Sequence, residues 1–190
     1  MSIQRDPDGK LPIAIVFGRD IHSPSRPFRH PVRGMRGVGV VIRVAGAGQD
    51  LSPFDWHACG LELVDAEVPT TAPSVTKAIH MVAGIEVEPT LTIDAAMPDA
   101  LEQLDLQWHE QTWPLLAATR SGAFFILPPG GGGVAVGWVP VKDMAPPGLP
   151  SRIAAATGTP EFVALSADGT HLCAVTAEEY EYWIIMRALG

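Results

Sequence analysis

Two short motifs in this chain place a histidine two residues before a cysteine, His57-Ala-Cys59 and His171-Leu-Cys173. Residues i and i+2 of a β-strand lie on one face, so each motif offers an imidazole and a thiolate in one direction. Together the two pairs would make a tetrahedral Cys₂His₂ zinc site. Cysteine is also among the most buried residue types without any metal, and structural zinc usually takes loop-borne Cys-x₂₋₄-Cys pairs. We therefore interpret both cysteines as core residues and expect no cofactor.

A second candidate for chemistry is the segment 19–36, in which arginine and proline are interleaved. Its arginines could clamp a phosphate or a carboxylate, because guanidinium binds planar anions through two parallel hydrogen bonds. His22 or His30 would then act as acid or base. A proline every three or four residues makes the segment extended, which points successive arginines in alternating directions. This favours contact with a partner over an anion pocket, and the residues expected to make it are Arg26, Arg29, Arg33 and Arg36.

The charges of the chain are distributed unevenly along its length. The first 43 residues carry eight Lys/Arg and three Asp/Glu, a net of +5, while the remaining 147 carry five and eighteen, a net of −13. This asymmetry indicates that the basic segment meets an acidic surface on the same chain, on a second copy or on another protein. The total charge of −8 and a pI near 5.1 argue against general nucleic-acid binding.

Motifs for nucleophilic catalysis and nucleotide binding are weak in this sequence. There is no Gly-x-Ser-x-Gly motif around Ser166, and a thiol in an apolar strand such as Cys173 tends to be unreactive. Gly37-Val-Gly39 lacks the third glycine of a dinucleotide fingerprint, and Gly130–Gly133 is followed by no Lys-Ser/Thr. No catalytic residue is predicted, and whether the chain is an enzyme stays open, with a non-enzymatic role favoured.

Aromatic residues near the C-terminus form the last candidate surface. Tyr180 and Trp183 share one side of an expected helix, and Trp and Tyr are enriched in protein interfaces. We predict that both contact a partner, with burial in the core as the alternative interpretation.

The elements that would position these residues are mostly short strands and turns, because Gly (19) and Pro (18) are both frequent. Strands are expected at Leu11–Phe17, Gly37–Val44, Leu61–Val68 and 85–93, the last at a sheet edge. Ser74–Ala83 is expected to be a helix. Met97–Trp113 is ambiguous between helix and strand: its apolar residues follow helical spacing, but Pro114 should end or kink any such helix. Two hairpins are expected, one joining Ala123–Leu127 to Val134–Val139 and one joining Phe162–Leu165 to His171–Val175.

The C-terminus is expected to be a helix over about 176–189, since Thr176-Ala-Glu-Glu179 has the pattern of a capping box. The fold class is therefore α+β: a mostly antiparallel sheet built from hairpins, a few short helices and this C-terminal helix. Residues 1–10 are expected to be a flexible terminus, and 11–190 a single globular domain. Apolar runs are too short to span a membrane, and two cysteines suit the cytoplasm.

These observations predict a non-enzymatic protein-interaction module. It would be an acidic cytoplasmic binder resembling immunity proteins in charge and size, or a structural protein that assembles through its basic segment. The alternative is a small anion- or phosphate-binding enzyme that uses the arginines and histidines of residues 19–36.

Overall fold

The computed structural model describes residues 54–84, 86–118, 121–130 and 133–190, all within the unit Arg43–Gly190. The predictions for residues 1–10, for the basic segment 19–36 and for the strands Leu11–Phe17 and Gly37–Val44 lie outside these residues. They stay predictions, as does the assignment of residues 11–190 to one domain.

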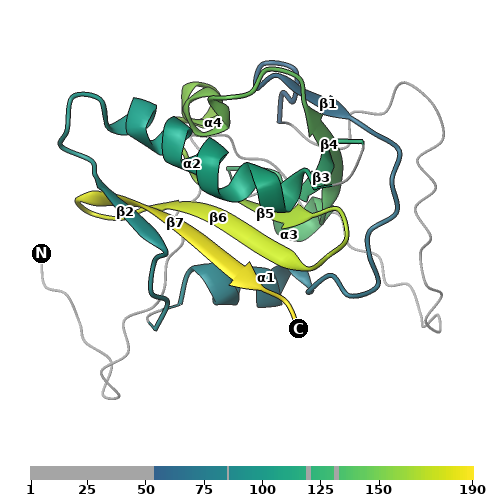
Figure 1. Cartoon of the computed structure of the whole chain (residues 1–190). Helices are drawn as coiled ribbons and strands as arrows, with labels where there is room; N and C mark the ends of the chain where they lie inside the picture. Colours follow the sequence, from purple (N-terminus) through teal and green to yellow (C-terminus); the bar gives the residue numbers. More distant parts are fainter. Residues whose placement is uncertain (1–53, 85, 119–120, 131–132) are drawn as a thin grey trace, which may run out of the picture. The chain divides into compact units, whose positions relative to one another are not determined.

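The described residues are organised around an antiparallel sheet of seven strands (Figure 1). Every neighbouring pair of strands is antiparallel, which confirms the predicted α+β class with a mostly antiparallel sheet. From one edge to the other, the strands are β1 (Leu61–Leu63), β4 (Val139–Asp143), β3 (Ala123–Ile126), β5 (Phe162–Ser166), β6 (His171–Ala177), β7 (Glu181–Ala188) and β2 (Leu91–Asp94).

Helices cover both faces of the sheet. α2 (Ala100–Leu116) and α4 (Leu149–Thr157) lie on one face, and α1 (Val75–Val82) and α3 (Gly133–Val136) on the other (Figure 1). Within the described ranges, no helix combines the length and the apolar character needed to cross a membrane.

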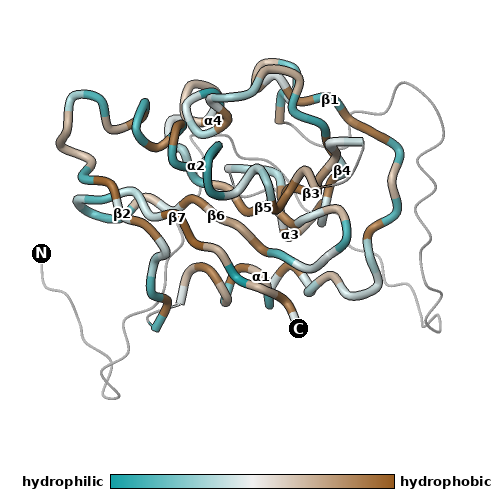
Figure 2. The backbone as a smooth tube through the Cα atoms, in the orientation of Figure 1, coloured by the Kyte–Doolittle hydropathy of each residue, from teal (hydrophilic) through white to brown (hydrophobic). Residues whose placement is uncertain are grey.

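Two hydrophobic clusters fill the space between the sheet and its helices. On the α2 side, Phe124 and Ile126 of β3 pack with Leu104 and Trp108 of the helix. On the α1 side, Phe125 packs with Ala78 and Val82. The sheet is thus buried on both faces, so its central strands are apolar at successive positions and not alternately (Figure 2).

The predicted β5–β6 hairpin is confirmed. Gly169 holds its tight turn with φ of +72°, a conformation that side chains disfavour. The turn also packs closely, because a Cβ at this position would lie 2.6 Å from Oγ1 of Thr71. Both requirements make glycine necessary here.

The predicted C-terminal helix over 176–189 is wrong, since these residues complete β6 and form β7. Tyr182 and Ile184 pack on the α2-side cluster, while Trp183 and Ile185 pack on the α1-side cluster. This is the two-residue period of a strand buried on both faces, which in a run of apolar residues also fits a helix. Thr176 does not cap a helix: its hydroxyl donates to Glu178, and the chain turns back at residues 178–180.

The other two predicted helices correspond to α1 and α2. The helix expected at Ser74–Ala83 is α1, and Ser74 caps it, its hydroxyl accepting the amide of Lys77 at 3.3 Å. Within Met97–Trp113 the chain is helical from Ala100 onward, and the helix passes through Pro114 to Leu116. A stripe of every fourth residue is buried in α2, and its burial offsets the hydrogen bond that proline removes; the stripe is Ala100, Leu104, Trp108, Thr112 and Leu116.

Three predicted strand regions are present but differ in extent from the prediction. β3 and β4 form the expected antiparallel pair, but residues 133–136 are helical and β4 begins at Val139. β1 spans Leu61–Leu63 and not the whole of Leu61–Val68. Of the expected edge strand in 85–93, the last three residues belong to β2, which spans Leu91–Asp94 and, within the described part of the chain, pairs with β7 at the edge of the sheet.

Arg152 on α4 links the ends of β1 and β4. Its side chain makes a bidentate ion pair with Asp143 at 2.7 Å to both oxygens, and Asp143 is almost fully buried. The remaining donors reach backbone carbonyls of Cys59 at 2.7 Å, Ala145 and Pro147. In turn, Asp105 of α2 accepts the amide of Ser151 in the first turn of α4 at 2.9 Å, where a carboxylate complements the helix dipole.

We predict that Arg152→Met lowers the free energy of unfolding by about 3 kcal/mol, because it leaves the buried Asp143 carboxylate without its cation. Urea unfolding followed by circular dichroism measures this. Arg187→Met is the matched control, since Arg187 makes one exposed hydrogen bond to the carbonyl of Glu88 and should cost about 1 kcal/mol or less. Equal losses in the two variants would contradict a central role for the Arg152 network.

Candidate functional site

Two acidic residues lie opposite each other on β2, at the edge of the sheet, and on its neighbour β7. In the β2–β7 register, Asp94 lies directly opposite Glu181, and Thr92 lies opposite Trp183. Both pairs point to the α1 side, because Leu91 and Ile93 between them point to the α2-side cluster. Like charges directly opposite on adjacent strands generally destabilise a sheet.

Aromatic side chains and further carboxylates surround this pair. The turn between β6 and β7 lies beside the end of β2, where the amide of Ala95 donates to the carbonyl of Tyr180 at 2.8 Å (Figure 1). Tyr180 is 71% exposed, and Trp183 is half-buried. We call this region the acidic–aromatic surface; its residues are Asp94, Glu178, Glu179, Tyr180, Glu181 and Trp183.

Hydrogen bonds orient the polar groups of this surface. Nε1 of Trp183 donates to Glu181 Oε2 at 2.9 Å, which holds the indole beside the carboxylate. The hydroxyl of Tyr180 donates to Glu179, and this hydrogen bond raises the pKa of the phenol. Asp94 Oδ1 accepts the amide of Ala96 at 2.8 Å. The carboxylates are therefore fixed in direction without being neutralised.

Cations are missing from the acidic–aromatic surface as far as the structure describes the chain. The one salt bridge among the described residues is Arg152–Asp143, which belongs to the other edge of the sheet. None of the four carboxylates of the surface has a lysine or arginine partner within the described ranges. The arrangement can therefore accept a positively charged group from outside.

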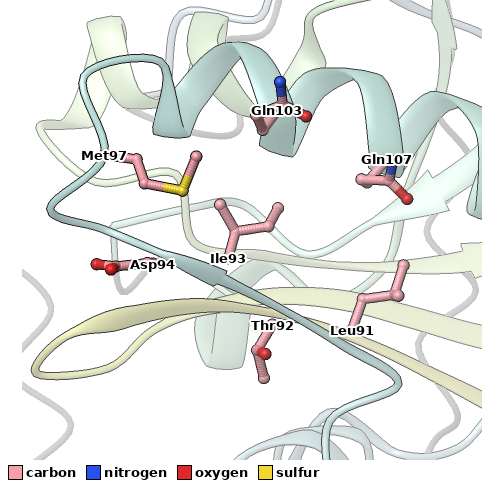
Figure 3. Close-up of a pocket in the computed structure, with 7 residues that line it drawn as sticks. All are labelled: Leu91, Thr92, Ile93, Asp94, Met97, Gln103 and Gln107. Atoms are coloured by element: carbon pink, nitrogen blue, oxygen red, sulfur yellow. The ribbon is translucent and has the colours of Figure 1, made fainter.

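A shallow groove lies beside the acidic–aromatic surface, between β2 and α2 (Figure 3). Leu91 and Ile93 point from the strand toward the helix, while Gln103 and Gln107 lie above them on α2. Met97 borders one end and is 42% exposed. The groove holds about 270 Å³, which is below the usual 300–1,000 Å³ of small-molecule sites. It has room for a few side chains of an extended segment.

The two His-x-Cys motifs do not come together as a metal site. Cys59 and Cys173 are both buried, whereas His57 is exposed, and His171 shares a hydrogen bond with the hydroxyl of Thr170. Among the described residues no three histidine, cysteine, aspartate or glutamate side chains are grouped to hold a metal ion.

Both thiols are poor nucleophiles in this environment. Burial raises the pKa of the Cys173 thiol to about 12. Burial also raises the pKa of Cys59, against an opposing effect of the nearby Arg152 guanidinium. Because the thiolate is the reactive form, neither cysteine is activated at neutral pH.

Ser166 belongs to a turn and not to a catalytic triad. Its hydroxyl donates to Asp168 Oδ1 at 2.6 Å and accepts the backbone amides of Thr170 and His171. The His171 ring contacts Thr170 and not Ser166, so among the described residues no histidine base is positioned to activate the serine. The network stabilises the β5–β6 hairpin.

Comparisons with family models, with curated proteins and with solved structures find no match to this chain.

Sequence reasoning named two residues of the acidic–aromatic surface, Tyr180 and Trp183, and the structure places both there. Their expected helix is a turn and a strand. The pairing of Asp94 with Glu181 was missed, because it depends on which strands are neighbours. The arginines Arg26, Arg29, Arg33 and Arg36 lie outside the described residues.

We predict that the Asp168 carboxylate makes stability depend on acid pH. Hydrogen bonds from Ser166 and Thr170 lower its pKa from 3.8 to about 2. A lowered pKa contributes stability above the unfolded value, and this contribution disappears as pH falls through the folded value. Asp168→Asn should therefore be less stable than the parent at pH 6, and the difference should shrink between pH 4 and pH 2.

Urea unfolding at several pH values measures this difference. Thr170→Val, which removes a hydroxyl donor to Asp168, should show part of the same pH dependence. A difference between Asp168→Asn and the parent that is constant from pH 6 to pH 2 would contradict the assignment.

Proposed function

We propose that this protein is a non-enzymatic interaction module whose acidic–aromatic surface binds a basic segment of another protein or of a second copy of this chain. Two versions follow from the same chemistry. One is an acidic, immunity-like inhibitor that captures a basic protein, and the other is a structural protein that assembles through its own basic residues.

The observation that carries this proposal is the direct opposition of Asp94 and Glu181. Their repulsion costs roughly 0.2–1 kcal/mol in the unbound state, and a cation placed between them removes that cost. A lysine or arginine side chain would thus be bound more tightly than by either carboxylate alone.

Trp183 and Tyr180 support the same choice of ligand. An arginine guanidinium stacks on indole faces by a cation–π interaction of about 0.5–2 kcal/mol, and it binds carboxylates through two hydrogen bonds. A half-buried tryptophan beside Glu181 offers both contacts to one side chain. The net charge of −8 would also steer a basic partner toward the molecule.

A binding role fits the described chemistry better than catalysis. The thiols are buried, Ser166 is held by its turn, and the groove of about 270 Å³ is small for a substrate. The two free cysteines suit action in the reducing cytoplasm, which we include in the proposal. The anion-binding alternative depends on residues 19–36, and nothing among the described residues favours it.

The test uses the double variant Asp94→Asn/Glu181→Gln and a synthetic peptide that copies residues 22–36. We predict that the variant binds this peptide about tenfold more weakly than the parent, since two charge contacts are lost. The variant should also unfold at about 0.5 kcal/mol higher free energy, because the repulsion is removed. Titration calorimetry at low salt and urea unfolding measure these two effects.

Glu62→Gln/Glu67→Gln is the matched control. It removes two exposed carboxylates at or beyond the β1 edge, which is opposite to β2 in the sheet. The control should keep the affinity of the parent. Equal weakening in both double variants, or binding that does not change with salt, would overturn the proposal.

A further inference from the structure

We infer that β2 binds its partner by strand addition, and that the added segment has apolar residues at every second position and lysine or arginine between them. This inference rests on the proposed function, because it specifies how a basic partner occupies the same side of the sheet. It adds the requirement that the backbone of the partner is extended and forms hydrogen bonds with β2.

The outer side of β2 is open within the described residues. β2 ends the order of strands and pairs with β7 alone. The amide of Ala95 bonds to Tyr180, and antiparallel ladders alternate in direction, so Leu91 and Ile93 bond toward β7. The N–H and C=O of Thr92 and the N–H of Asp94 then face outward, where an extended chain can bond to them.

The two sides of this edge differ in chemistry. On the α2 side, an added strand would place every second side chain in the groove, against Ile93, Met97 and the amides of Gln103 and Gln107 (Figure 3). On the α1 side, its other side chains would lie directly beside Asp94, with Glu181 one strand farther in, within the reach of a long lysine or arginine side chain. Apolar residues suit the first environment and cations suit the second.

Asp94 also explains why the edge would not pair with any strand at random. A charged side chain on an edge strand blocks pairing with neutral or acidic strands, which cannot neutralise it. A strand with lysine or arginine opposite this carboxylate removes the obstacle. The same group therefore excludes unsuitable strands and selects basic ones.

The probe is the peptide acetyl-Val-Lys-Val-Lys-Val-Lys-Val-amide with the full-length protein. Two further versions carry N-methyl groups, one on the valine amides and one on the lysine amides, at equal charge. In a strand, alternate amides point to opposite sides, so one version loses its bonds to β2 and the other keeps them. We expect one version to bind at least about tenfold more weakly than the other.

Equal affinity of the two N-methylated peptides, whether retained or lost, overturns strand addition. The peptide copying residues 22–36 separates the two proposals, because its three prolines remove amide donors and make it a poor strand. If the two N-methylated peptides bind equally and the 22–36 peptide still binds through Asp94 and Glu181, the proposed function stands and strand addition is wrong. If neither parent peptide binds, both fall.

Amide exchange of the protein provides an independent readout. On addition of the parent Val/Lys peptide, exchange at Thr92 should slow, while exchange at Ile93, already bonded to β7, should change little. The double variant Asp94→Asn/Glu181→Gln should need more peptide for the same effect. Unchanged exchange at Thr92 with saturating peptide overturns the inference.

Discussion

The hydrogen bonds of Arg152 are the interaction on which the packing of one half of this fold depends. From α4, one guanidinium holds the end of β4 through Asp143 and the approach to β1 through the carbonyl of Cys59. α4 is in turn attached to α2 through Asp105. Because α2 covers the sheet from this side to β2, the position of α2 over the groove depends partly on contacts at the opposite edge.

Local signals predicted the elements whose cause is local. The turn at Gly169 needs a positive φ, which glycine adopts readily, and Ser74 caps α1 with its own side chain. Both causes can therefore be recognised in the sequence. The residues 181–188 have no such signal. Their apolar run fits either period, and what decides is burial on both faces between two layers of helices. The helix also continues past Pro114, since the burial of Leu116 outweighs the hydrogen bond that proline removes.

The residues of the candidate site also fall into two groups, those that the sequence could single out and those that depend on the pairing of strands. Aromatic residue type was enough to single out Tyr180 and Trp183, because such side chains are common at interfaces whatever their secondary structure. The carboxylates could not be chosen from the sequence, where Asp94 and Glu181 are two among 21 acidic residues. Only the pairing of β2 with β7 sets them opposite each other, and that pairing is a property of the whole sheet.

The two buried thiols can report local opening in two different parts of the sheet. Cys59 lies at the entry to β1, at the edge of the sheet, whereas Cys173 lies in β6, with strands on both sides. Each can be alkylated only when its own surroundings open, and edges of a structure generally open at lower free energy than centres. The alkylation rates of the two sulfurs would therefore measure separately how often the edge and the centre of the sheet open, in the unmutated chain.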